Sequence, residues 1–114
     1  MKMKLIIIDD EPDFCQILQL VFSKKGFEVF LFHSLIAGLE AIETIKPDIV
    51  ILDNNLPDGL GWKQCRDLAT LYPRTQFHLI SAFEDKDASE PTIGNSKIHL
   101  WQKPMRLEDL SRCF

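Results

Sequence analysis

A run of four apolar residues, Ile49 to Leu52, ends at an acidic residue, Asp53. Three of the four are β-branched, which favours a short strand that is buried on both faces of a sheet. The turn-forming sequence LPDG follows at residues 56–59, where proline fixes φ and glycine permits positive φ. We therefore predict a central strand that opens into a loop, with Asp53 at its carboxyl end, where a carboxylate rarely serves structure alone.

The length and composition limit the classes of protein to which this chain can belong. The 114 residues, 46% of them hydrophobic, suffice for one domain, residues 1–114, with a core that needs no metal or disulfide. The formal net charge is −4 and the basic residues are scattered, which argues against direct binding of nucleic acid. No apolar run approaches the roughly 20 residues that span a membrane. We expect a cytoplasmic protein that contacts neither nucleic acid nor membrane directly.

Strand-like and helix-like segments alternate along the chain. Apolar runs of strand length occupy residues 4–9, 27–32, 49–52, 76–81 and 97–102. Apolar residues at helical spacing follow four of these runs, beginning at Pro12, after the expected N-cap Ser34, near Gly61 and after Pro104. This alternation predicts right-handed βαβ units and therefore a doubly wound α/β fold with a five-stranded parallel sheet.

The segment between the last two predicted strands departs from this pattern. Residues 84–97, EDKDASEPTIGNSK, include few apolar residues and carry Pro91 and Gly94 in their interior. Both residue types disfavour the interior of a helix. We predict that the fourth helix is short, irregular or mobile.

Polar residues stand at the ends of four predicted strands. In doubly wound sheets, ligands bind beyond the carboxyl ends of the strands, so these side chains should meet at one edge. The residues concerned are Asp9, Asp10, Asp53, Ser81 and Lys103.

The chemistry of this set follows from its charges. Three carboxylates that lie close together repel one another unless they share a proton or bind a cation, and Mg²⁺ is a hard ion that prefers oxygen ligands. The ammonium group of Lys103 and the hydroxyl of Ser81 are suited to the oxygens of a phosphoryl group. We therefore predict phosphoryl transfer, with Asp53 as the nucleophile.

In these residues the sequence resembles the receiver domain of bacterial two-component response regulators, over nearly its whole length. The matching elements are Asp9-Asp10, Asp53 with Leu56-Pro57 and Gly61, Ser81-Ala82 and Lys103-Pro104. The resemblance implies a flavodoxin-like (βα)5 fold and a phosphoacceptor that promotes only its own phosphorylation and dephosphorylation, rather than an enzyme that acts on other substrates.

The resemblance also implies roles for individual residues. Asp53 accepts the phosphoryl group from a sensor histidine kinase or a phosphotransfer protein. Mg²⁺ is held by Asp9, Asp10, Asp53 and the main-chain carbonyl of Asn55, and Ser81 and Lys103 contact the phosphoryl group. A cis peptide precedes Pro104, and a downstream effector protein, or an effector domain missing from this chain, receives the signal. Two questions are left undecided: whether a homodimer forms on phosphorylation, and whether the chain is a stand-alone receiver or an excised domain.

One residue departs from the family pattern. Leu100 stands where receivers usually carry Tyr or Phe as a switch, three residues before the lysine. Trp101 is adjacent, but strand parity predicts that it points to the opposite face of the sheet from Leu100. The usual aromatic switch is therefore not expected here.

Two other functions remain as alternatives. One is a receiver-like module that binds its partners without phosphate, which Leu100 and the segment 84–97 motivate. The other is a phosphatase of the haloacid dehalogenase type, although Glu11 occupies the position where that family requires a second aspartate.

For several residues a structural role is an alternative to a functional one. Asp9, Asp10 and Glu11 could be only a cluster at a helix N-terminus, where carboxylates are favoured. Three cysteines at 15, 65 and 113 show no metal-ligand spacing and are expected to be reduced thiols with no basic neighbour, and the histidines at 33, 78 and 99 are expected to be isolated.

Overall fold

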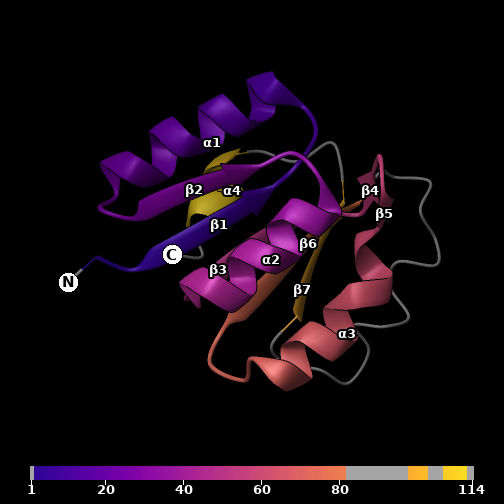
Figure 1. Ribbon diagram of the computed structural model, residues 1–114. Coiled ribbons are helices and arrows are strands. Elements are labelled where there is room, and N and C mark those ends of the chain that lie inside the picture. Colours follow the sequence, from indigo (N-terminus) through magenta and orange to yellow (C-terminus); the bar gives the residue numbers. More distant parts are fainter. Residues whose placement is uncertain (1, 82–97, 103–106, 113–114) are drawn as a thin grey trace.

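The computed structural model describes residues 2–81, 98–102 and 107–112, which form a parallel sheet with helices on both faces (Figure 1). Five parallel strands form the sheet in the order β2-β1-β3-β6-β7. This order confirms the predicted doubly wound α/β fold. Along the chain the elements are β1 (Lys4–Ile8), α1 (Pro12–Lys24), β2 (Glu28–Phe32), α2 (Leu35–Ile45), β3 (Ile49–Asp53), β4 (Asn55–Leu56), β5 (Gly59–Leu60), α3 (Gly61–Leu71), β6 (Gln76–Ser81), β7 (Ile98–Gln102) and α4 (Leu107–Ser111).

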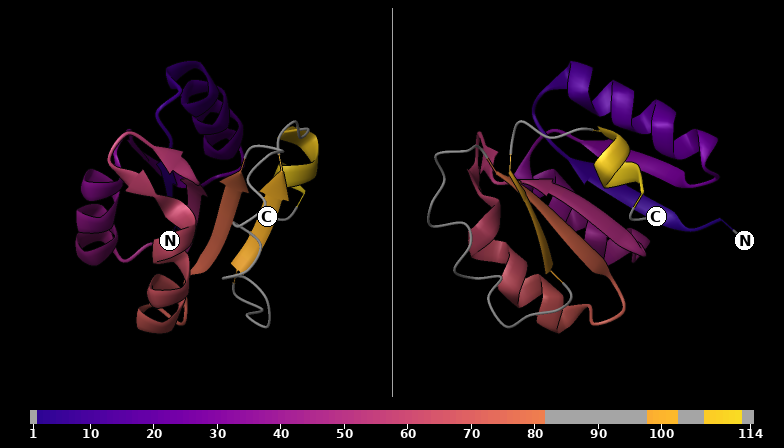
Figure 2. Two further views of the ribbon diagram at one scale, coloured as in Figure 1. Left: turned by 90° about the vertical axis from the view of Figure 1, so that its right-hand side faces the viewer. Right: turned by 180° about the vertical axis from the view of Figure 1, so that it is seen from behind.

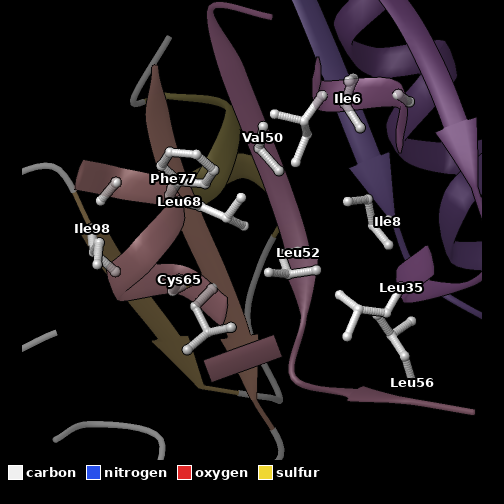
Figure 3. Close-up of a cluster of buried hydrophobic side chains, with 14 residues drawn as sticks. Ile6, Ile8, Leu35, Val50, Leu52, Leu56, Cys65, Leu68, Phe77 and Ile98 are labelled. Atoms are coloured by element: carbon white, nitrogen blue, oxygen red, sulfur yellow. The ribbon is translucent and has the colours of Figure 1, made fainter. Parts of the chain in front are cut away.

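The pleat of the strands divides the hydrophobic core into two layers, because successive side chains point to opposite faces of the sheet. One layer, the α2/α3 core, contains Ile6 and Val50 from the sheet and Leu35 and Leu68 from the helices (Figure 3). The other, the α1/α4 core, contains Ile7, Ile51, Phe22 and Leu110, among others. Figure 2 shows these helix pairs on opposite faces of the sheet. All five residues of β3 are buried, as expected for a central strand covered on both faces.

Local signals explain the helix ends. Pro12 begins α1, where its missing N–H is no loss. The Ser34 hydroxyl accepts a hydrogen bond from the Ala37 N–H at 3.2 Å, which confirms the predicted N-cap of α2. Lys46 ends α2 in the left-handed region, with φ of 53°, one residue before Pro47. Among the described residues, no helix is long and apolar enough to cross a membrane.

The predicted strands agree with the structure to within one residue at each end, and one small element was not predicted. Residues 55–60 form a two-stranded antiparallel hairpin, β4 and β5, where the sequence predicted a turn only. Strands of two residues are too short for a periodic signal. The segment 84–97, predicted to be an irregular helix, lies outside the described residues.

Candidate functional site

Three predicted acids meet at the carboxyl edge of the sheet. Asp9 follows β1, and Asp53 is the last residue of β3, the strand beside it, so parallel pairing brings both to the same edge. Asp9, Asp10 and Asp53 each offer a carboxylate oxygen, and these oxygens lie within 4.8 Å of one another. Asp9 and Asp53 are buried, at 1% and 5% exposure, whereas Asp10 is exposed. The predicted gathering of these carboxylates is therefore confirmed.

The main chain and side chain of Asp9 are held by several hydrogen bonds. The Asp9 N–H donates to the Phe32 carbonyl at 3.0 Å, and its carboxylate accepts from the Glu11 N–H at 2.8 Å. The Asp9 carbonyl lies 2.9 Å from His33 Nδ1 and accepts from the Cys15 thiol at 3.3 Å. His33 follows β2, so the expectation that it is isolated was wrong.

Main-chain hydrogen bonds hold the loop after Asp53, and one of them reaches β6. The Asn54 N–H donates to the Ile80 carbonyl at 2.8 Å, and the Gly61 N–H donates to the Asn54 carbonyl at 2.8 Å. A Cβ on Gly61 would lie 2.7 Å from the main-chain oxygen of Asp53, closer than real Cβ atoms approach. Glycine is therefore required at position 61 to let the start of α3 pack against the end of β3.

The remaining predicted site residues surround Asp53 to different extents. Asn55 is exposed, and its N–H donates to the Asp53 carboxylate at 3.3 Å. Ser81 ends β6, the strand beside β3, and its hydroxyl oxygen is buried with no hydrogen-bond partner among the described residues. Lys103 lies outside the described residues, as does Pro104 with its predicted cis peptide.

Asp58 has a role that its turn position did not suggest. Its two carboxylate oxygens accept hydrogen bonds from the main-chain N–H groups of Leu35, at 2.7 Å, and Ile36, at 2.9 Å. These bonds hold the pKa of Asp58 below its ordinary value, with the Ile36 N–H as the largest cause. The hairpin after Asp53 is thus joined to the N-terminus of α2. The first N–H groups of a helix have no acceptor within the helix and require one from elsewhere. Nothing in the sequence identifies which distant residue supplies that acceptor.

Leu100 and Trp101 point to opposite faces of the sheet, as predicted. Leu100 packs against the α2/α3 core, and Trp101 packs against the α1/α4 core. The Trp101 indole N–H donates to His78 Nδ1 at 2.9 Å, and the His78 ring stacks on His99 with centroids 4.6 Å apart. These two histidines are adjacent in the β6–β7 register, so they too are not isolated. Burial, and to a smaller extent His99, lowers the pKa of His78 to about 4.

Cys15 and Cys65 are free, buried thiols, as predicted, while Cys113 lies outside the described residues. Burial raises the pKa of Cys65 to about 12. Burial, together with the charges of nearby acids led by Asp9, raises the pKa of Cys15 to about 11. His33 Nδ1 lies 4.0 Å from Cys15 Sγ, but the pKa of the thiol is raised rather than lowered, as expected for a cysteine without an activating base. The Cys15 thiol therefore stays protonated at neutral pH and can donate a hydrogen bond.

The donor set of the edge suits a hard divalent cation. Asp9, Asp10 and Asp53 supply only carboxylate oxygens, which Mg²⁺ prefers, and an ion between them relieves their mutual repulsion. The buried Ser81 hydroxyl adds a donor that no described residue uses. The residues present therefore fit Mg²⁺ together with an anionic group.

Comparisons with known proteins agree with this geometry. The regulatory protein AtoC of Escherichia coli K12 is 24% identical over 108 residues, which make up 95% of this chain but 23% of AtoC. The structure of a CheY-like response regulator receiver domain protein from Methanospirillum hungatei has a TM-score of 0.89 at 20% identity, and the match covers 99% of this chain and 90% of that one.

A response regulator structure from Burkholderia pseudomallei, described with a phosphorylated aspartic acid, a calcium ion and citrate, has a TM-score of 0.83 at 17% identity, over 96% of this chain and 65% of that one. A model of the response regulator receiver domain family matches residues 5–113. On that match, which leaves out only five residues, this chain belongs to the family of response regulator receiver domains.

Proposed function

We propose that Asp53 accepts a phosphoryl group in a Mg²⁺-dependent reaction. The observation that carries this proposal is the position of Asp53, buried at the carboxyl end of the central strand with two further carboxylates within 4.8 Å. The B. pseudomallei relative, which has the same fold, carries a phosphorylated aspartate and a bound calcium ion, and this supports the assignment. Asp9, Asp10, Asp53 and the main-chain carbonyl of Asn55 would hold Mg²⁺, which neutralises charge on the phosphoryl oxygens when bound.

Two groups of the protein act in the transfer step itself: the Asp53 carboxylate and the Asn55 N–H. A carboxylate oxygen of Asp53 attacks phosphorus in line and forms a new P–O bond. The P–N bond of a phosphohistidine donor breaks, and its electron pair stays with the imidazole of the donor. The Asn55 N–H, which lies 3.3 Å from a carboxylate oxygen of Asp53, helps to orient the nucleophile.

Ser81 and Lys103 are the proposed contacts of the transferred group. The Ser81 hydroxyl is buried on the strand beside Asp53 and is available to donate to a phosphoryl oxygen. The Lys103 ammonium would supply a compensating positive charge. Loss of these contacts on dephosphorylation would provide a local difference between two signalling states.

Response regulators as a family work with histidine kinases and effectors. For this chain we propose a sensor histidine kinase or a phosphotransfer protein as donor, in the cytoplasm. An effector protein or effector domain would receive the signal, and a homodimer formed on phosphorylation is one form that the output could take.

The direct test is the intact mass of the protein after incubation with acetyl phosphate, with Mg²⁺ and with a chelator. We expect one added phosphoryl group that requires Mg²⁺ and is lost in Asp53→Asn. Asp67→Asn, at an exposed position in α3, is the matched control and should be phosphorylated as the wild type is. No adduct in any condition would indicate a module that binds partners without phosphate, and turnover of phosphomonoesters would indicate a phosphatase.

A further inference from the structure

The carbonyl oxygen of Asp9 is contacted by two side chains from different elements. His33 Nδ1, which follows β2, lies 2.9 Å away, and Cys15 Sγ, in α1, lies 3.3 Å away. A carbonyl oxygen has two lone pairs, so the two side chains can fill its capacity as an acceptor. Neither residue was a candidate from the sequence, and neither has a part in the proposed transfer reaction.

The chemistry of the acceptor settles which nitrogen of His33 carries a proton. A carbonyl oxygen can only accept, so a contact of 2.9 Å requires a hydrogen on Nδ1. In the neutral ring, Nε2 is then the unprotonated nitrogen. The other tautomer would set the Nδ1 lone pair against the carbonyl oxygen and leave only the Cys15 thiol, 4.0 Å away, as a donor to that nitrogen.

The carbonyl of Asp9 belongs to the peptide that carries Asp10. A peptide unit is planar and includes the Cα atoms of both residues, so two hydrogen bonds at its oxygen fix the plane and the position of the Asp10 Cα. The Asp9 carboxylate has its own restraint, the Glu11 N–H at 2.8 Å. Asp10 is exposed, in contrast to Asp9 and Asp53, so surrounding side chains restrain it least. Its position in the cluster therefore depends most on hydrogen bonds to its own peptide.

We propose that His33 is a positioning residue for the cation site. Its Nδ1–H, with the Cys15 thiol, holds the Asp9–Asp10 peptide in the orientation that brings the Asp10 carboxylate to Asp9 and Asp53. The proposal rests on the proposed function in taking this cluster as a Mg²⁺ site. Groups that orient metal ligands commonly change metal affinity by about 10-fold or more when they are removed.

The first test needs no variant, no metal and no phosphoryl donor. A long-range ¹H–¹⁵N correlation spectrum of the wild type, at a pH of about 8.5 where ordinary imidazoles are neutral, reports the tautomer of each histidine. We expect the Nδ1–H tautomer for His33. The Nε2–H tautomer, or the averaged shifts of a freely exchanging ring, would overturn the proposal.

The second test measures Mg²⁺ affinity from the amide shifts of residues 9–11 during a titration. His33→Phe removes the donor and should weaken binding by about 10-fold. His33→Asn should stay within about 2-fold of the wild type, because its amide nitrogen is attached to Cγ as Nδ1 is and can donate to the same carbonyl. His33→Gln carries its nitrogen one bond further out, so it should resemble His33→Phe. Equal affinities for the Asn, Gln and Phe variants would contradict the proposal.

Cys15 provides an independent check on the same carbonyl. Cys15→Ser keeps an O–H donor and Cys15→Ala removes it, so Mg²⁺ affinity should fall further in the Ala variant. If His33 has the expected tautomer and His33→Phe weakens Mg²⁺ binding as expected, but acetyl phosphate gives no adduct, the proposed function fails and the positioning role stands. If Asp53 is phosphorylated but His33→Phe binds Mg²⁺ as the wild type does, the positioning role fails and the proposed function stands.

Discussion

Two polar regions of the molecule differ in whether their polar groups are paired with one another inside the protein. The acid edge consists of Asp9, Asp10 and Asp53, at the carboxyl ends of β1 and β3. The histidine pair consists of His78 and His99, adjacent on β6 and β7, with Trp101 beside them. The first region gathers like charges, whereas the second pairs donors with acceptors.

In the histidine pair, the ring of His78 is satisfied inside the protein. Its Nδ1 accepts from the Trp101 indole, which can only donate, so Nε2 carries the proton and faces Gln76 Oε1 at 3.4 Å. In the acid edge, three carboxylates converge, and the nearby Ser81 hydroxyl has no partner among the described residues. The difference teaches that burial alone does not identify a site: a buried polar group indicates function where the protein itself does not balance it.

The largest expected effect comes from crowding the acid edge with Gly61→Ala. The added Cβ would lie 2.7 Å from the Asp53 main-chain oxygen and 3.0 Å from Leu52 Cγ. Overpacking of this kind, against backbone as well as side chain, should reduce the free energy of unfolding by about 3 kcal/mol. Urea denaturation followed by circular dichroism measures the loss.

Gly26→Ala separates this steric cost from the cost of positive φ. Gly26 has φ of +95° but nothing within 4 Å of an added Cβ, so its replacement should cost only about 1 kcal/mol. Equal losses for the two variants would mean that the end of β3 yields to the added methyl group, and that the acid edge tolerates the crowding.

The second effect is a loss of stability on acidification that arises in the histidine pair. Burial lowers the pKa of His78 from the ordinary value of 6.5 to about 4, so between these values the unfolded chain binds a proton that the folded protein does not. Stability should therefore fall as the pH drops below 6.5, by about 2 kcal/mol between pH 7 and pH 5. Urea denaturation at a series of pH values measures it.

Replacing His78 by asparagine sharpens this prediction. The Asn side-chain oxygen can accept from the Trp101 indole as Nδ1 does, but it does not titrate, so the fall in stability between pH 7 and pH 5 should largely disappear. His99→Asn removes the charge that helps to lower the pKa of His78 and should reduce the fall only slightly. An unchanged pH dependence in His78→Asn would show that groups other than His78 cause the effect.

The fold was predictable from the sequence because its strands are buried on both faces. Runs such as Ile49–Leu52 leave no other arrangement that covers them, and the observed ends lie within one residue of those predicted. The β4–β5 hairpin was missed because each of its strands has two residues. Its pairing of Asn55 with Leu60 depends on the tight path between Asp53 and Gly61, which no periodic pattern encodes.

The acid edge was predictable in part because its position follows from the parallel sheet. Parallel strands end together, so Asp9 and Asp53 had to meet once their strands were recognised. The same rule places His33, which follows β2, at this edge, but nothing in the sequence indicates that its ring contacts the Asp9 carbonyl. The partners of Asp58 could not be inferred, because the bonds join residues 22 and 23 positions apart along the chain through three-dimensional packing alone.

The smallest expected effect concerns the hydrogen bonds that Asp58 accepts, which join the β4–β5 hairpin to the N-terminus of α2. Asp58→Ala removes both acceptors of the Leu35 and Ile36 N–H groups and should lower the thermal midpoint by a few degrees. Asp58→Asn keeps one acceptor oxygen and should lie between Asp58→Ala and the wild type. Asp67→Asn, an exposed change of equal charge in α3, should leave the midpoint unchanged.

The pH dependence of this tie has a defined direction. The folded pKa of Asp58 lies below its ordinary value of 3.8, so its contribution is complete above that value and is lost as the pH falls through the lower, folded value. The difference in thermal midpoint between wild type and Asp58→Ala should therefore be constant from pH 7 to pH 5 and shrink below pH 4. That range lies below the one in which His78 acts, so the effects of Asp58 and His78 should separate in a single pH series. A difference that shrinks already between pH 7 and pH 5 would contradict the assignment of this pH dependence to the Asp58 carboxylate.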